Sequence, residues 1–135
     1  MIVSLHVATG AAGGAVVRSR PAAVLLGVAA HAAGDYMPHH DIPNRRFELW
    51  SGAAALLAIA LRRGFADPVT IGAAAGSAPD VEHVLRLPRP GGRKLFPTHR
   101  VRAWHRTGGM PASVQLLAAG VLLGLLLAPT TGRRR

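Results

Sequence analysis

Histidine and carboxylate side chains recur in this chain at spacings that suit a metal ion. The first group follows an apolar run and places His31 and Asp35 four residues apart, with His40 and Asp41 beyond Pro38. Residues four apart share one face of a helix, so this imidazole and this carboxylate would point the same way. Imidazole and carboxylate are ligands of zinc and other divalent cations. The same residues would equally suit a helix C-terminus followed by a turn.

A second group of polar residues follows the fourth apolar stretch, in the run G-S-A-P-D-V-E-H over Gly76–His83. Asp80 and His83 are three residues apart and would face one way on a helix. Ser77 and Asp80 also fit a capping pattern, and acidic residues here, Glu82 included, favour a helix N-terminus. Capping does not account for His83, so this group stays a candidate for metal binding.

A third group lies in a basic segment near the C-terminus, where His99 is followed by Arg100 and then by the run Trp104–Arg106. A guanidinium beside an imidazole could hold a phosphate oxygen next to a bound metal. A basic loop of this kind would also suit contact with anionic lipid. His6 stands alone in the first apolar stretch, where it fits either a metal ligand or a hydrogen-bonded core residue.

The composition narrows the classes of partner. The chain of 135 residues has a formal net charge of +10, which favours anionic partners such as phospholipid head groups or phosphorylated substrates. Cysteine is absent, which excludes disulfides and thiolate metal ligands. Only three Phe, two Trp and one Tyr are available for base stacking, so nucleic-acid binding is disfavoured.

The apolar pattern predicts an all-α fold, a small helical membrane bundle of four or five helices with a long basic loop before the last. The whole chain, 1–135, forms one domain, and the expected helices cover about 2–17, 22–36, 47–61, 68–83 and 110–128. The last apolar run is about 18 residues long, enough to cross a bilayer, and Arg133–Arg135 would anchor its end. These features predict a multi-pass membrane protein, with its orientation open.

The order of the helices predicts where the polar groups meet. If five helices alternate in direction, His6 and the three histidine-containing groups all fall at one end of the bundle. Arginines at 18, 20, 62, 63 and 133–135 fall at the other end. This segregation favours a single site built from segments that are distant in sequence.

The same motifs resemble two groups of metal-dependent hydrolases. An early histidine, H-x-x-x-D at His31, G-S-x-P-D-x-x-H over Gly76–His83 and T-H-R at Thr98 resemble bacterial integral-membrane proteins described as metal-dependent hydrolases. The run H-A-A-G-D-Y-M-P-H-H is similar to a motif of helical zinc-dependent phospholipases C and related nucleases. Glu82 stands where the first family has a second aspartate, and H-x-x-x-D precedes the H-R motif rather than following it.

The resemblance implies a zinc-dependent phosphodiesterase chemistry. The residues that match the motifs are His31, Asp35, Asp80, His83 and His99, with weaker matches at His6, His40 and Asp41. In the resembling enzymes such side chains hold zinc ions that activate water.

Together these observations predict a membrane-bound hydrolase of an ester or phosphoester, with lipid among the candidate substrates. The expected cofactor is a divalent metal, zinc first and manganese or magnesium as alternatives. Glu82 or Asp41 would accept the proton of water, and Arg100, with Arg102 or Arg106, would neutralise a phosphoryl oxygen. The alternative is a non-catalytic membrane protein with structural His/Asp clusters and a basic docking loop.

Overall fold

A computed structural model describes residues 1–85, 87–104, 106 and 108–129. The α-helices are α1 (Val3–Val17), α2 (Arg20–Tyr36), α3 (Arg45–Arg63), α4 (Pro68–Ser77), α5 (Val81–Val84), α6 (Pro97–Arg100) and α7 (Ala112–Leu127). Short 3-10 helices cover Ala78–Asp80, Pro90–Gly92 and Arg102–Trp104, and no strand occurs in the described part of the chain. The prediction of an all-α fold is therefore confirmed.

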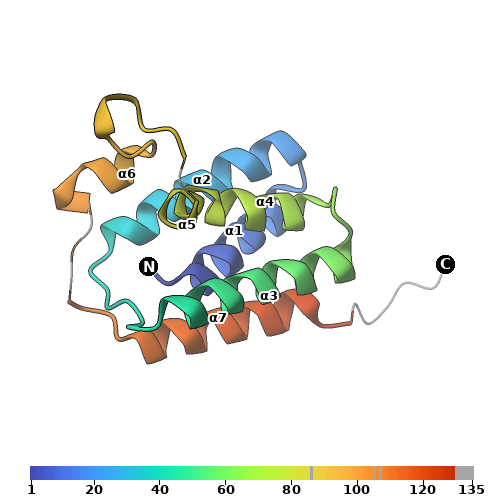
Figure 1. The fold of residues 1–135 in the computed structure, drawn as a ribbon. Helices are drawn as coiled ribbons and strands as arrows, with labels where there is room; N and C mark the ends of the chain where they lie inside the picture. Colours follow the sequence, from blue (N-terminus) through green and yellow to red (C-terminus); the bar gives the residue numbers. More distant parts are fainter. Residues whose placement is uncertain (86, 105, 107, 130–135) are drawn as a thin grey trace.

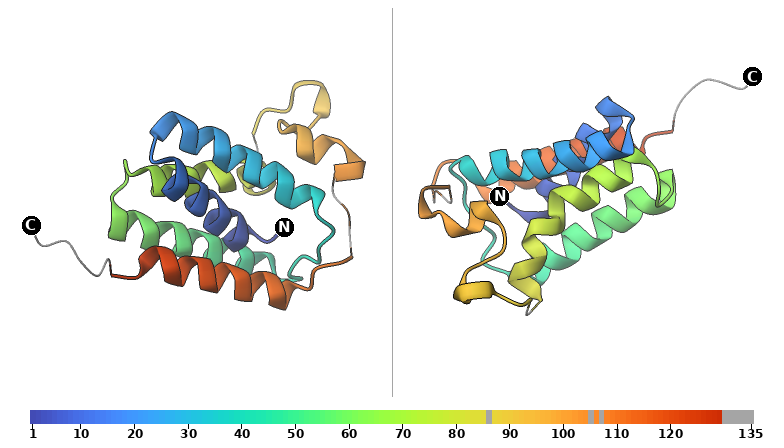
Figure 2. Two further views of the ribbon diagram at one scale, coloured as in Figure 1. Left: turned by 180° about the vertical axis from the view of Figure 1, so that it is seen from behind. Right: turned by 90° about the horizontal axis from the view of Figure 1, so that it is seen from above.

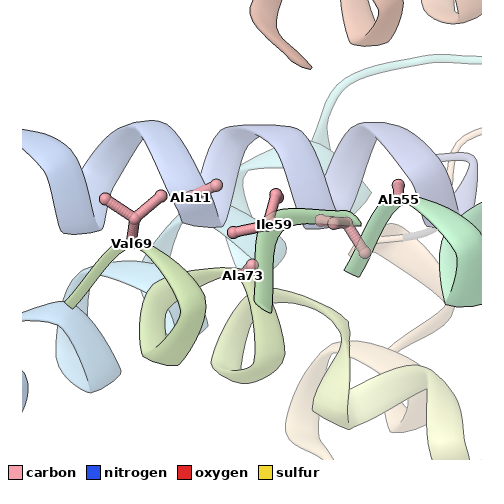
Figure 3. Packing of buried hydrophobic residues seen from close by; sticks show 6 residues of the cluster. Ala11, Ala55, Ile59, Val69 and Ala73 are labelled. Carbon is pink, nitrogen blue, oxygen red and sulfur yellow. The ribbon is translucent and has the colours of Figure 1, made fainter. Parts of the chain in front are cut away.

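Helix α1 runs through the centre of the bundle, with α2, α3, α4 and α7 packed around it (Figure 1; Figure 2). Its sequence is apolar on every side, which is the pattern of a helix surrounded by others. Figure 3 shows Ala11 of α1 meeting Ile59 of α3 and the side chains of Val69 and Ala73 of α4. A second cluster, around Leu5, joins α1 to α7.

Glycines allow α1 and α4 to approach unusually closely. A Cβ atom added at Gly10 would lie 2.2 Å from the carbonyl oxygen of Gly72, and one added at Gly76 would lie 2.6 Å from that of His6. Only a residue without a side chain fits such a backbone contact. The close crossing brings the end of α4 beside the beginning of α1, which is where His6 stands.

The fourth helix ends earlier than the sequence pattern predicts. Asp67 caps its first turn by accepting a hydrogen bond from the backbone N–H of Val69 at 2.8 Å, and Pro68 occupies the first helical position. The expected helix over 68–83 is interrupted after Ser77 by a 3-10 turn that contains Pro79. Proline lacks the N–H that a continuing α-helix needs. The break redirects the chain, so that α5 begins at a new angle.

The membrane placement predicted from the apolar runs is wrong. No helix in the described part of the chain is both long enough and apolar enough to cross a bilayer. Helix α7, the expected span over 110–128, has 16 residues and measures about 24 Å, against a hydrocarbon thickness of about 30 Å. Helix α3 has 19 residues but carries charged side chains in its first and last turns. The expected basic anchor, Arg133–Arg135, lies outside the described residues.

The segment between α5 and α7, expected as an irregular loop, contains short helices. Pro97 starts α6 at the position where a missing N–H has no consequence. The backbone N–H of Leu95 donates to Glu82 Oε2 at 2.6 Å, so the segment is tied to α5 just before α6 begins. This attachment fixes where His99 lies.

Buried Gln115 of α7 joins three segments near the same end of the bundle. Its Oε1 accepts from the backbone N–H of Ile2 at 3.0 Å, and its Nε2 donates to the carbonyls of His40 at 2.8 Å and Met110 at 3.2 Å. The polar interruption of the last apolar run is therefore a fully hydrogen-bonded core residue.

Candidate metal centre

Four elements bring histidine and carboxylate side chains to one end of the bundle. His6 lies in the first turns of α1, and His31 and Asp35 lie in the last turns of α2. Asp80 ends the 3-10 turn after α4, and His99 lies in α6 (Figure 1). Because α1, α2 and α4 alternate in direction, the start of α1 meets the ends of α2 and α4, as the alternating-helix argument expects.

Asp35 is the point on which three imidazoles converge. Its carboxylate is buried, with Oδ2 lying 3.0 Å from His31 Nε2 and 3.4 Å from His99 Nε2. Its Oδ1 lies 3.2 Å from His6 Nε2. The rings of His6 and His31 are stacked with centroids 4.0 Å apart, and the Nε2 atoms of His31 and His99 are 3.4 Å apart. The nitrogens and the carboxylate thus face a common point.

In two of these histidines the second ring nitrogen, Nδ1, lies against an acceptor oxygen that fixes the ring. His31 Nδ1 lies 2.9 Å from the carbonyl oxygen of Gly76, and His99 Nδ1 lies 2.5 Å from Glu82 Oε1. A carbonyl or carboxylate oxygen can only accept, so Nδ1 donates in both cases. Nε2 faces Asp35 and offers a lone pair to a cation when the ring is neutral. This arrangement is how proteins orient histidines that bind a metal.

Burial and neighbouring side chains shift the pKa values of the histidines and aspartates in this cluster. Burial lowers the pKa of His6 to about 3, so the ring is neutral. Burial alone would raise the pKa of Asp35, but the neighbouring imidazoles of His31, His6 and His99 outweigh it and hold the pKa well below its usual range. Burial raises the pKa of Asp80 to about 6. Burial alone would lower the pKa of His99, but Asp35 and Glu82 outweigh it and raise that pKa. A cation would therefore compete with a proton at His99, since neutral imidazoles and ionised carboxylates are the forms that coordinate a metal.

Several buried polar atoms at this point make no hydrogen bond of regular geometry with the described residues. They are both ring nitrogens of His6, Oδ2 of Asp35 and Oδ2 of Asp80. Buried polar atoms are almost always satisfied in folded proteins. A divalent cation would supply the missing partner for the unprotonated nitrogen of His6 and for the carboxylate oxygens, and the residues present therefore fit one.

Three overlapping sets of side chains could hold an ion, each with its ligand atoms within 4.8 Å of one another. The sets are His6, His31 and Asp80; His31, Asp35 and His99; and Asp80, His83 and His99. We call the six residues of these sets the metal centre. The His/Asp groups expected as metal ligands are thus brought together, apart from His40.

The outer side of the metal centre opens into a cavity of about 330 Å³. Asp80 and His83 line it, together with Asp41 and Glu48. The Asp80 side chain is 17% exposed, whereas those of His31 and Asp35 are 1% exposed. A small molecule can therefore reach Asp80 from solvent, while the inner ligands stay enclosed.

Two predicted residues after α2 lie apart from the metal centre. His40 is exposed and belongs to none of the three ligand sets. Asp41 is 57% exposed and pairs with His39 Nε2 at 3.2 Å. The sequence motif contained His39 as well, but only the structure shows that it, rather than His40, is the buried histidine of the pair.

The predicted arginines differ in their distance from the metal centre. Arg100 donates to the carbonyl of Lys94 and lines a cavity of about 510 Å³ beside His99. The Arg106 guanidinium lies over the ring of Tyr36, 5.0 Å from its centroid. The Arg102 side chain and His105 lie outside the described residues. Of these arginines, Arg100 is the one whose placement beside the metal centre is described.

Glu82, which the sequence predicted as a proton acceptor, lies against the Nδ1 side of His99. It is fully buried, and its two oxygens accept from Leu95 and from His99. No signal in the sequence pairs Glu82 with a histidine 17 residues later. Comparison with models of protein families, with curated proteins and with solved structures gives no match for this chain.

Proposed function

We propose that this chain is a divalent-metal-dependent hydrolase of an ester or phosphoester. The observation that carries the proposal is the convergence of three imidazole nitrogens on buried Asp35, with two of the rings anchored through Nδ1. Imidazole and carboxylate ligands favour zinc, with manganese as the next choice. The motif resemblance to helical metal-dependent hydrolases is part of this proposal.

His31, Asp35 and His99 would hold the cation, and His6 would complete its ligands. When bound, such a cation polarises the scissile group and lowers the pKa of a water molecule toward neutrality. The cavity at Asp80 and His83 gives water and substrate a way to the metal centre.

Asp80 is the residue that we assign as proton acceptor. It lines the cavity, and its buried Oδ2 makes no hydrogen bond of regular geometry with the described residues. Glu82, the first choice from sequence, already accepts two hydrogen bonds. We therefore assign Glu82 as a positioning residue for His99, and Asp41 as part of the cavity wall.

Basic side chains next to His99 favour a substrate that carries negative charge. Arg93, Lys94 and Arg100 line the hollow beside that histidine. Guanidinium groups bind phosphoryl oxygens through paired hydrogen bonds and stabilise charge that develops there. A phosphoester is therefore the preferred substrate over a neutral ester.

The first experiment is elemental analysis of purified protein after loading with zinc or manganese, followed by hydrolysis assays with small phosphoesters and esters. We expect bound metal in the wild type and in Glu48→Gln, and none above background in Asp35→Asn. Asp80→Asn should keep at least part of the metal and lose hydrolysis. A wild type that takes up no metal would overturn the proposal.

A structural metal site is the second candidate. The burial of His6, His31 and Asp35 favours it, because a saturated inner site leaves no place for water. In that case the loaded wild type would hydrolyse none of the substrates, and Asp35→Asn would lose stability together with metal.

A further inference from the structure

We propose that the substrate carries a hydrocarbon chain, and that this chain lies in a groove between α3 and α4 which starts at the metal centre. This inference rests on the proposed function, because it assigns the tail of the molecule whose head is hydrolysed. We call the feature the α3–α4 groove. It consists of two apolar hollows that continue the polar cavity at Asp80.

The first step is the continuity between the polar cavity and a smaller hollow of about 120 Å³. Both are lined by Val3, Leu49, Asp80 and Val84. The small hollow has Val7 of the central helix in its wall and is otherwise almost entirely apolar. Asp80 therefore stands at the boundary between a polar space and an apolar one.

The second step is the continuation into a larger apolar hollow of about 620 Å³. Ala53 and Leu56 of α3 line both apolar hollows. The larger one continues along Ile71 and Ala74 of α4 and reaches Phe65 in the connection between the two helices. The lining thus runs from Asp80 to Phe65 along facing sides of α3 and α4.

The architecture explains why a groove remains here. Helices α3 and α4 both pack against α1, and they lie side by side along its length (Figure 1; Figure 2). The residues that face each other across the groove include small ones, such as Ala53 and Ala74, which do not fill the space. Leu57 is 53% exposed and Phe65 is 74% exposed, so apolar surface at the groove faces water.

The change from a polar lining at Asp80 to an apolar lining between α3 and α4 indicates what kind of molecule fits the groove. A molecule whose head lies at the metal centre beside Asp80 and whose alkyl chain lies along α3 would match both ends of the lining. The stretch from Leu49 to Ala60 on α3 measures about 16 Å, the length of a chain of roughly a dozen carbon atoms. A second protein copy would cover the apolar surface, but it would not account for the continuity of that surface with the polar cavity at Asp80.

The test measures binding of n-alkyl phosphonates, which are not hydrolysed, by titration calorimetry below their micelle concentrations. The series runs from methyl to decyl phosphonate, with metal-free and zinc-loaded protein. We expect affinity to rise roughly three- to fourfold for each added methylene, up to the length of the groove. Affinities that do not depend on chain length would overturn the inference.

Two neighbouring substitutions on α3 provide a matched pair. Ala53→Phe would place a ring where the two apolar hollows meet, whereas Ala54→Phe would add the same exposed ring outside all three hollows. We expect Ala53→Phe to abolish the dependence on chain length and Ala54→Phe to leave it unchanged. Equal behaviour of the two variants would contradict the assignment.

The outcomes separate this inference from the proposed function. If the protein binds no metal but affinity still rises with chain length, the groove stands and the hydrolase proposal fails. If metal binds and chain length has no effect, the groove assignment fails alone. Sedimentation of both variants checks the competing occupant: a shift from dimer to monomer in Ala53→Phe only would assign the groove to a second copy.

Discussion

Glu82 orients His99 through a carboxylate whose two oxygens both accept hydrogen bonds. Its Oε2 accepts from the backbone N–H of Leu95 and its Oε1 accepts from His99 Nδ1. Burial alone would raise the pKa of this carboxyl, but the hydrogen bonds from Leu95 and His99 lower it below its ordinary value. The residue is therefore charged when it orients the ring.

We expect Glu82→Gln to weaken metal binding by about 10- to 100-fold, the range found when the support of a ligating histidine is removed. The substitution keeps the size of the side chain but leaves only one acceptor oxygen, so one of the two hydrogen bonds is lost and stability falls by about 1–3 kcal/mol. Competition against a zinc-binding dye measures the affinity, and urea unfolding measures the stability.

Glu48→Gln is the control for this substitution. Glu48 also accepts from a backbone N–H, that of Ile42 at 3.3 Å, but it belongs to none of the three ligand sets. Its zinc affinity should equal that of the wild type. An unchanged affinity in Glu82→Gln would show that the orientation of His99 does not depend on Glu82.

At the scale of single residues, the sequence predicts which side chains could bind a metal better than it predicts where each of them lies in the fold. Spacing of four on one helix places His31 and Asp35 on one face, and the structure shows their side chains in contact. His39 and His40 are identical in type and adjacent, so nothing in the sequence tells which is buried. That is decided by pairing of this segment with Arg106 and Met110, since the backbone N–H of His39 donates to the carbonyl of Arg106 at 3.2 Å.

At the scale of elements, the crossing of α1 and α4 sets the geometry of the metal centre. The backbone contact between Gly10 and Gly72 lies one turn away from His6, and the end of α4 presents the Gly76 carbonyl to His31. Any widening of this crossing would separate His6 and Gly76 from the ligands on α2.

We therefore expect Gly10→Ala to destabilise the protein by about 1–3 kcal/mol, the range for a methyl group forced into a packed interface. Because the helices must move apart, metal affinity should fall as well. Gly120→Ala on α7 is the matched control, since an added Cβ there meets nothing within 4 Å. The control should gain up to about 1 kcal/mol from helix propensity. Thermal unfolding of both variants decides, and equal stability of the two would refute the packing argument.

The elements that the sequence predicted well are those with local signals. The N-cap and the first-position proline of α4 are examples, because capping depends only on neighbouring residues. The expected helix over 68–83 ran past the end of α4, although Pro79 just after Ser77 is itself a local signal that an α-helix stops. The last apolar run was misinterpreted as a span because its composition matches that of a helix in lipid, whereas α7 is only 16 residues long.

At the scale of the whole molecule, the metal centre places several ionisable side chains inside a small helical bundle. Asp35, His6 and His31 are each at most 1% exposed. Without a cation, the atoms of this centre that make no regular hydrogen bond reduce the stability of the folded chain. Binding of a cation to the folded state alone would then stabilise the entire bundle, because folding and binding are linked.

We expect zinc at about 100 times its dissociation constant to stabilise the folded state by about 2.7 kcal/mol, a rise in melting temperature of roughly 10 °C. A chelator should reverse the rise. Asp35→Asn should lose it, because a neutral amide neither attracts the cation nor coordinates it as a carboxylate does. Asp67→Asn is the matched control, since asparagine also caps a helix and the residue lies at the far end of α4. Scanning calorimetry measures the shift. If zinc leaves the melting temperature of the wild type unchanged, the converging side chains do not form a metal site.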